Sequence, residues 1–252
     1  MTSRSDWCVP SRATTCPSTA TAARDRASAQ TAIRAAQTAV ESTDQPVKVE
    51  TDIIWGDPVH ALREQSRSAA MLCLGALGVR RSGGRRIGST AAAVADSSHC
   101  PVAVIRGYDP PPATPGWIVA EIDDSPDCHC VLDHAVAEAL LRNAPLRVLT
   151  TWRARFTDMA GYQAIADNNR HIRAHQERLL SPYRTRHPEL DAHGVAVHGS
   201  TEGYLGRNAE SIGLLVIGHR RSAGLAKLLA LGHSALHEGT CSVLVCPASS
   251  GL

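Results

Sequence analysis

Short apolar runs alternate with amphipathic stretches along most of the chain. In the C-terminal half, this pattern predicts strands at residues 117–122, 146–151, 195–198, 214–217 and 243–246. Apolar positions spaced three or four residues apart predict helices at 127–142 and 161–180, a short helix near 201–211 and another before the last strand. Strands that alternate with helices indicate an α/β fold, with a mostly parallel sheet flanked by helices.

The N-terminal half shows a shorter version of the same alternation. It predicts a helix at 25–41, a strand at 47–53, a helix opened by Asp57 and Pro58, and buried strands at 72–74 and 102–105. Compared with the other half, an opening strand, helix and strand are missing. Residues 1–24 lack an apolar run and contain Pro10 and Pro17, so we expect a poorly ordered tail there.

A proline-rich segment, residues 108–116, separates two halves that repeat each other. Prolines at this density suit neither a helix interior nor a central strand, which indicates a linker. On each side an apolar strand, a loop, a helix and a final strand follow in the same order, and Cys100 and Val102 align with Cys241 and Val243. We infer a duplication, with a tail (1–24), an incomplete first repeat (25–107), the linker (108–116) and a second repeat (117–248).

Composition narrows the class of protein. A formal net charge of +2 is too small to indicate a nucleic-acid or membrane partner, and no apolar run reaches the length of a membrane span. The first residues lack the apolar core of an export signal. With eight cysteines and no such signal, we expect reduced thiols and a cytoplasmic protein.

The candidate chemistry lies in a glycine-bordered segment after the strand at 72–74. Gly75, Gly78 and Gly88 allow close approach of a ligand to the backbone, and Ser89 and Thr90 begin an alanine-rich helix. Free amides and hydroxyls at a helix start bind phosphate. A plain strand-to-helix turn explains the glycines equally well. The spacing matches neither a P-loop nor a dinucleotide-binding fingerprint.

The spacing Gly75-x2-Gly78-x9-Gly88-Ser89 resembles the signature of the universal stress proteins. Residues 99–105 are similar to the strand that follows it in that family. The resemblance implies that Gly75, Gly78, Gly88 and Ser89 hold the phosphates of ATP, with Mg²⁺ as an optional companion. It implies that Asp123, which lies in a turn similar to the family's opening Gly-Ile-Asp-Gly-Ser, occupies the position of the residue that contacts adenine, here in the second repeat.

The chain departs from the family pattern in both repeats. The first repeat lacks the opening strand that would supply its adenine-contacting Asp. The second repeat retains Gly218, but Arg221 occupies the position that corresponds to Gly78 of the first repeat. Gly232 does not align with Gly88, whether positions are counted from Gly218 or from Cys241. Each repeat therefore has half of an ATP site, with weak binding expected at the first loop. The resemblance also implies pairing of the last strands, 102–105 and 243–245, either between repeats or in self-association.

Three other clusters have simpler explanations. Cys128 and Cys130 flank His129, but positions i and i+2 of a helix face different directions, so no metal site is predicted. Asp123 and Asp124 could hold Mg²⁺ or simply cap a turn. His171 and His175 belong to a highly charged, solvated helix face.

The sequence favours an ATP-binding sensor or regulatory protein of the stress response. No general base is placed near the glycine segment, so enzymatic turnover is not predicted. Two alternatives remain: a dimerising interaction module without nucleotide, and a nucleotide hydrolase of a related α/β fold. Fold resemblance alone does not decide among them.

Overall fold

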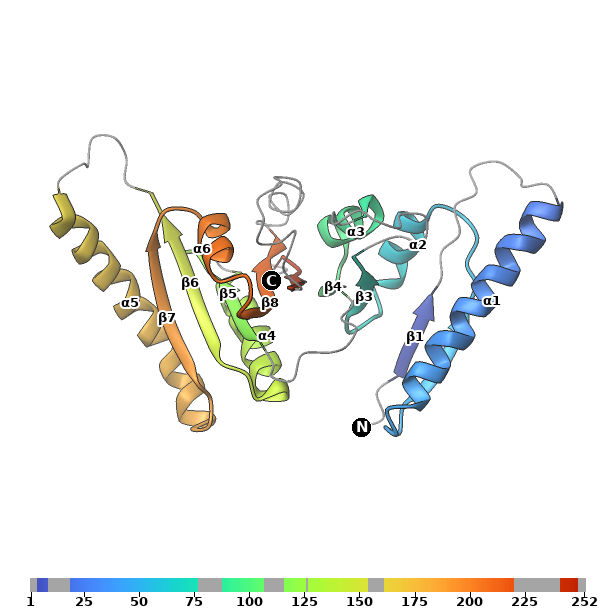
Figure 1. Ribbon diagram of the computed structural model, residues 1–252, viewed down its shortest axis with the longest axis horizontal. Coiled ribbons are helices and arrows are strands. Elements are labelled where there is room, and N and C mark those ends of the chain that lie inside the picture. Colours follow the sequence, from blue (N-terminus) through green and yellow to red (C-terminus); the bar gives the residue numbers. More distant parts are fainter. Residues whose placement is uncertain are drawn as a thin grey trace. The chain divides into compact units, whose positions relative to one another are not determined.

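The computed structural model describes residues 4–8, 19–76, 88–106, 116–125, 127–153, 161–219 and 241–248. They belong to two compact units, Met1–Ser68 and Ala69–Leu252 (Figure 1). Within the described ranges, no helix combines the length and the apolar character needed to cross a bilayer.

The first unit contains a two-stranded parallel sheet and two helices. In chain order these are β1 (Arg4–Cys8), α1 (Thr19–Glu41), β2 (Lys48–Asp52) and α2 (Pro58–Gln65). β1 and β2 pair from Arg4 opposite Lys48 to Cys8 opposite Asp52. The predicted start of α2 is confirmed: Asp57 is the N-cap, and its carboxylate accepts a hydrogen bond of 2.9 Å from the amide of His60.

The expectation of a tail without regular structure is wrong for part of residues 1–24. Residues 4–8 form β1, and α1 begins at Thr19 rather than at residue 25. The segment 4–8 has no apolar run that would have predicted a strand. Its strand conformation depends on pairing with β2, which is distant in sequence. Residues 9–18 lie outside the described part of the chain.

The second unit is built on a seven-stranded sheet with the order β3-β4-β9-β8-β5-β6-β7. Its strands are β3 (Leu72–Gly75), β4 (Val102–Ile105), β5 (Trp117–Glu121), β6 (Leu146–Trp152), β7 (Ala192–His198), β8 (Ile212–Gly218) and β9 (Ser242–Cys246). All neighbouring strands are parallel except β4 and β9, which are antiparallel.

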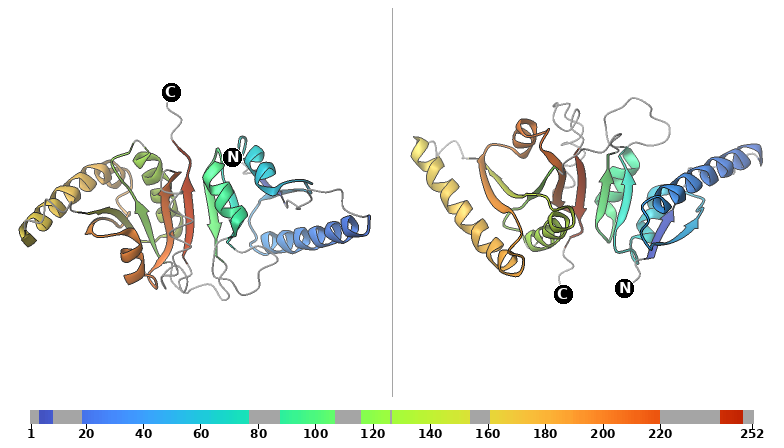
Figure 2. Two further views of the ribbon diagram at one scale, coloured as in Figure 1. Left: turned by 90° about the horizontal axis from the view of Figure 1, so that it is seen from above. Right: turned by 60° about the horizontal axis from the view of Figure 1, so that its bottom comes forward.

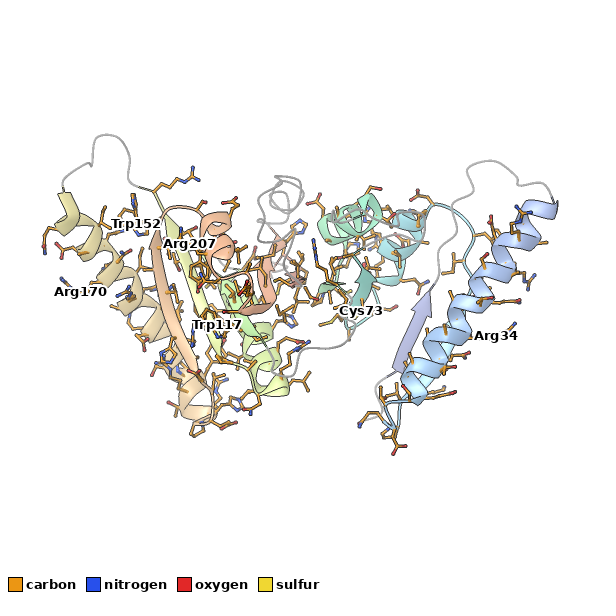
Figure 3. The ribbon with its side chains drawn as sticks, in the orientation of Figure 1. Arg34, Cys73, Trp117, Trp152, Arg170 and Arg207 are labelled. Atoms are coloured by element: carbon orange, nitrogen blue, oxygen red, sulfur yellow. The ribbon has the colours of Figure 1, made fainter. Side chains whose placement is uncertain are left out.

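The described part of this unit has four helices beside the sheet: α3 (Ser89–Ser97), α4 (Cys128–Arg142), α5 (Gly161–Arg186) and α6 (Thr201–Arg207). α4 packs on β5 and β8, and its Leu132 and Ala135 are fully buried with Ile118 and Val216 of the strands. α5 runs along β7 (Figure 2). Trp152 of β6, labelled in Figure 3, donates its indole N–H to Asn169 of α5 over 2.8 Å.

The pairing of the two final strands is present in this sheet. Val102 lies opposite Val245 and Val104 opposite Val243, and all four side chains are at most 2 % exposed. The family-implied contact between residues 102–105 and 243–245 is therefore observed within one chain. Because β4 and β9 are antiparallel, the carboxyl ends of β3 and β4 lie at one edge of the sheet and those of β9, β8 and β5 at the other.

The repeats differ by one central strand and the helix after it. β2, β3 and β4 correspond in order to β7, β8 and β9, and β1 pairs with β2 as β6 pairs with β7. In the second repeat β5 joins β8 to β6. The described part of the first repeat contains no counterpart of β5 or α4, and its strands accordingly belong to two separate sheets.

Candidate functional site

The two ends of the glycine-bordered segment are held together by backbone hydrogen bonds. β3 ends at Gly75, and the next amide, that of Ala76, donates to the carbonyl of Ile105 over 2.8 Å. The carbonyl of Ala76 accepts the amide of Gly88, also over 2.8 Å. The end of the strand pair β3–β4 is therefore fixed against the start of α3; β4 is mostly buried, whereas β3, predicted to be buried, alternates between half-buried and exposed residues.

The start of α3 presents backbone donors without an intrahelical acceptor. Gly88 is the N-cap in an extended conformation and has no side chain to cap the helix. The first helical hydrogen bond runs from Ala92 to the carbonyl of Gly88 over 3.1 Å. The amides of Ser89, Thr90 and Ala91 therefore come before Ala92, the first amide that donates within the helix, as expected at a helix start suited to an anion.

The residues at this helix start differ in exposure. Ser89 is exposed, Gly88 and Thr90 are half-buried, and Ala91 is buried against the unit. Gly78 and the arginines between Gly75 and Gly88 lie outside the described residues. The predicted phosphate residues Gly75, Gly88, Ser89 and Thr90 thus lie at one edge of the sheet, where β3 ends and α3 begins.

Asp123 and Gly218 meet at the other edge of the sheet, beside the first turn of α4. They line a cavity of about 10 Å³ together with Glu121, Ser125, Asp127 and Cys128 of the surrounding loop and helix. One water molecule needs about this much space, whereas pockets for small ligands measure several hundred Å³. As bounded by the described residues, the cavity has room for a water but not for an adenine ring.

Asp123 caps a turn, which is one of the two roles that the sequence allowed for it. Its Oδ1 accepts a hydrogen bond of 3.0 Å from the amide of Ser125, which caps the turn between β5 and α4. Gly218 lies close to that helix: a Cβ atom there would stand 3.5 Å from Val131 Cγ2 and 3.6 Å from Asp127 Cβ. Both distances are ordinary van der Waals contacts, so the packing of β8 on α4 would also accept a Cβ atom at this position.

The structure does not bring the two halves of the predicted ATP site together. The glycine group follows β3, and Asp123 follows β5, two strands on opposite sides of the antiparallel pair β4–β9. Cys73 of β3 and Trp117 of β5, both labelled in Figure 3, mark these two strands. Each group must therefore be judged as a site by itself.

Comparison with known proteins agrees with this duplicated architecture. The model of the universal stress protein family matches residues 9–106 and 118–247. The chain belongs to the universal stress protein family. The two matches, on either side of the proline-rich segment, are consistent with family domains in tandem, and the first match contains the glycine segment.

Several curated members of the family are similar in sequence. Universal stress protein Rv2028c of Mycobacterium tuberculosis is 38 % identical over 207 residues, which cover 81 % of this chain and 71 % of that protein. Universal stress protein Rv2624c of the same organism is 35 % identical over 207 residues, covering 81 % and 72 %.

Solved structures support the fold. A universal stress protein from Archaeoglobus fulgidus superimposes with a TM-score of 0.65 at 15 % identity, over 92 % of this chain and 80 % of that one. A putative universal stress protein from Pseudomonas aeruginosa gives a TM-score of 0.57 at 16 % identity, over 96 % and 82 %.

Sequence analysis missed a buried polar group at the second edge of this universal stress protein. Glu121, the last residue of β5, is 3 % exposed, lines the small cavity and accepts a hydrogen bond from Thr201 at the start of α6. The hydroxyls of Thr201 and Thr151 are 3.1 Å apart. A charged residue that ends an otherwise apolar strand was the available signal, but its partners lie far away in sequence.

Proposed function

We propose that this universal stress protein is a nucleotide-binding regulatory protein, and that its first repeat receives the phosphates of ATP at the start of α3. The supporting observation is the arrangement of β3 and α3, in which the amide of Gly88 donates to the carbonyl of Ala76 and the first helical hydrogen bond begins only at the amide of Ala92. An anion at that position would satisfy donors that the helix itself leaves open.

The residues at the helix start suit a phosphate group. The amides of Ser89 and Thr90 would donate to phosphate oxygens, and the two hydroxyls add charge-assisted hydrogen bonds worth about 1.5–3 kcal/mol each. The φ of Gly88 is −63°, a value that any residue can adopt without strain. Glycine is therefore suited to this position because it has no side chain that would obstruct a ligand. ATP, with or without Mg²⁺, is the nucleotide that the family resemblance implies.

The edge that holds Asp123 contributes less to this proposal. Its cavity of about 10 Å³ is too small for a base, and Asp123 caps a turn. Nucleotide binding in this chain therefore rests on the glycine segment alone, and we expect weak affinity because the first repeat lacks a counterpart of β5 among its described residues.

Calorimetry with ATP tests the proposal on the full chain. Gly88→Leu would fill the approach to the helix start, and we expect it to abolish the binding heat. Ser89→Ala should weaken binding about tenfold through loss of one hydroxyl contact. Ser97→Ala is the matched control, because Ser97 lies on the same helix and its hydroxyl bonds only to the carbonyl of Ala93 over 2.8 Å.

Asp123→Asn distinguishes the two edges of the sheet. If ATP binds at the glycine segment, this substitution leaves the heat unchanged. If Asp123→Asn abolishes binding while Gly88→Leu does not, the nucleotide site lies in the second repeat and the proposal is wrong. Equal heats from wild type and both variants would refute either location.

An interaction module without nucleotide is the second candidate. The observation that favours it is the pairing of β4 with β9, which buries Val102, Val104, Val243 and Val245. A wild-type chain that gives no heat with ATP and retains its cooperative unfolding transition would support this alternative.

A further inference from the structure

Two cysteines and a histidine meet between α4 and β9, away from the glycine segment. Cys130 and His134 come from α4 and Cys246 is the last residue of β9. One ligand atom from each side chain lies within 4.8 Å of the other two. Cysteine sulfur and imidazole nitrogen are the usual protein ligands of Zn²⁺.

The fold explains why these three side chains converge. Cys130 and His134 are four residues apart, so they lie one turn from each other on the same face of α4. α4 packs against β9, and the sheet register holds Cys246 opposite Gly218 of β8. Cys128, two residues before Cys130, instead lines the small cavity beside Asp123.

The burial of the cluster gives it a closed side and an open side. Cys246 is fully buried, whereas Cys130 and His134 are half-buried. A cation could therefore reach the cluster from the side of Cys130 and His134 on α4 and be bound on its buried side by Cys246 of β9. Three protein ligands leave the fourth position of a tetrahedral ion to water or to a small ligand.

The charges near the cluster favour a cation. The carboxylates of Asp133 and Asp127 lie near enough to the Cys130 thiol to act on it electrostatically. Cys130 packs in the core cluster with Cys246, and a purely apolar role would require neither the histidine nor the acidic residues.

We propose that Cys130, His134 and Cys246 form a binding site for a zinc-type divalent cation. On binding, the two thiols release their protons to solvent and form metal–sulfur bonds, and the neutral imidazole donates a nitrogen lone pair. The ion would tie α4 to β9, the strand that also carries the pairing with β4. The site would thereby link metal binding to the contact between the final strands.

Titration of Co²⁺ into the reduced full-length chain provides a spectroscopic test. We expect a thiolate-to-cobalt charge-transfer band and intense visible bands of a tetrahedral ion, saturating at one equivalent and lost on addition of Zn²⁺. Cys130→Ser and His134→Gln should each weaken apparent affinity by at least tenfold. Cys128→Ser is the matched control: it removes a half-buried cysteine of the same helix and should leave the spectrum unchanged.

A second measurement uses the unmodified protein and avoids dependence on variant folding. Zn²⁺ should slow alkylation of Cys130 by a thiol reagent, measured by peptide mass analysis, and leave Cys128 reacting at its original rate. Absence of the cobalt spectrum, or a spectrum that Cys128→Ser abolishes and Cys130→Ser preserves, would overturn the proposal. Equal protection of both cysteines would also overturn it.

Discussion

Gln176 of α5 provides a sharp test of how the second repeat is held together. Its side chain is fully buried, and its amide nitrogen donates to the carbonyl of Val148 (2.9 Å), the hydroxyl of Thr150 (3.0 Å) and the carbonyl of Val195 (3.2 Å). These acceptors lie on β6 and β7, so one side chain connects a helix to two neighbouring strands. The three acceptors also fix which end of the amide is nitrogen.

The expected cost of Gln176→Leu follows from these contacts. An amide nitrogen has two N–H bonds, so the three acceptors share two hydrogen bonds, which contribute about 1 kcal/mol net each and about 2 kcal/mol together. Among the described residues, Gln176 Oε1 has no hydrogen-bond partner, and replacing that atom with a methyl group stabilises the fold by about 1 kcal/mol. We therefore expect Gln176→Leu to lower the free energy of unfolding by about 1 kcal/mol.

Gly194 of β7 reports on the same contact from the opposite side. A Cβ atom at this position would stand 2.5 Å from Gln176 Oε1 and 2.9 Å from Gln176 Cβ. Gly194→Ala must therefore displace the glutamine or the strand, with an expected cost of about 1–3 kcal/mol. A Gln176→Ala background removes Oε1 but keeps the Cβ atom at 2.9 Å, so only the part of that cost that comes from Oε1 should disappear.

Urea denaturation, followed by the fluorescence of Trp117 and Trp152 on β5 and β6, measures all four proteins of this cycle. Gly194→Ala and Gln176→Ala should show a coupling energy above about 1 kcal/mol. If Gly194→Ala costs the same in both backgrounds, or if Gln176→Leu leaves the transition midpoint unchanged, the inferred role of Gln176 is wrong.

Two further predictions concern a helix cap and an ion pair. Asp57→Ala removes the N-cap of α2 and should destabilise that helix by about 1 kcal/mol, which amide hydrogen exchange at His60 would show as roughly fivefold faster exchange; an unchanged rate would contradict the cap. The hydrogen bond from Arg184 lowers the pKa of Glu177 below its ordinary 4.5. The pair therefore stabilises the fold above about pH 4.5, and this contribution is lost as pH falls through the lowered pKa. Since Glu177 is 51 % exposed, Glu177→Gln should cost less than about 1 kcal/mol at neutral pH, and its melting temperature should approach that of wild type in acid.

Most strands and helices could be predicted from the sequence because their apolar periodicity is strong. The β5, β6 and β8 strands, α4 and the cap at Asp57 agree with the pattern to within a few residues. α5 continues through Pro182 to Arg186, beyond its predicted end at residue 180. β1 was missed because a short polar strand is determined by its neighbour rather than by its own residues.

The candidate site was only partly predictable. Local spacing identified the strand end at Gly75 and the helix start at Ser89, both of which the structure shows. Whether these residues bind phosphate stays a prediction. The separation of Asp123 from the glycine segment depends on the antiparallel contact of β4 with β9, and the meeting of Cys130 with Cys246 depends on helix packing. Both arrangements depend on contacts between residues distant in sequence, so local sequence patterns do not predict them.

The position of β9 in the sheet has a consequence for biosynthesis. Ser242–Cys246 comes last in chain order among the described strands, yet it lies between β8 and β4 in the interior of the sheet. During translation, β3 and β4 emerge long before the neighbour on which their attachment depends. β3 and β4 can therefore join the other strands of this sheet only after β9 has left the ribosome, whereas β5, β6, β7 and β8 can pair before that.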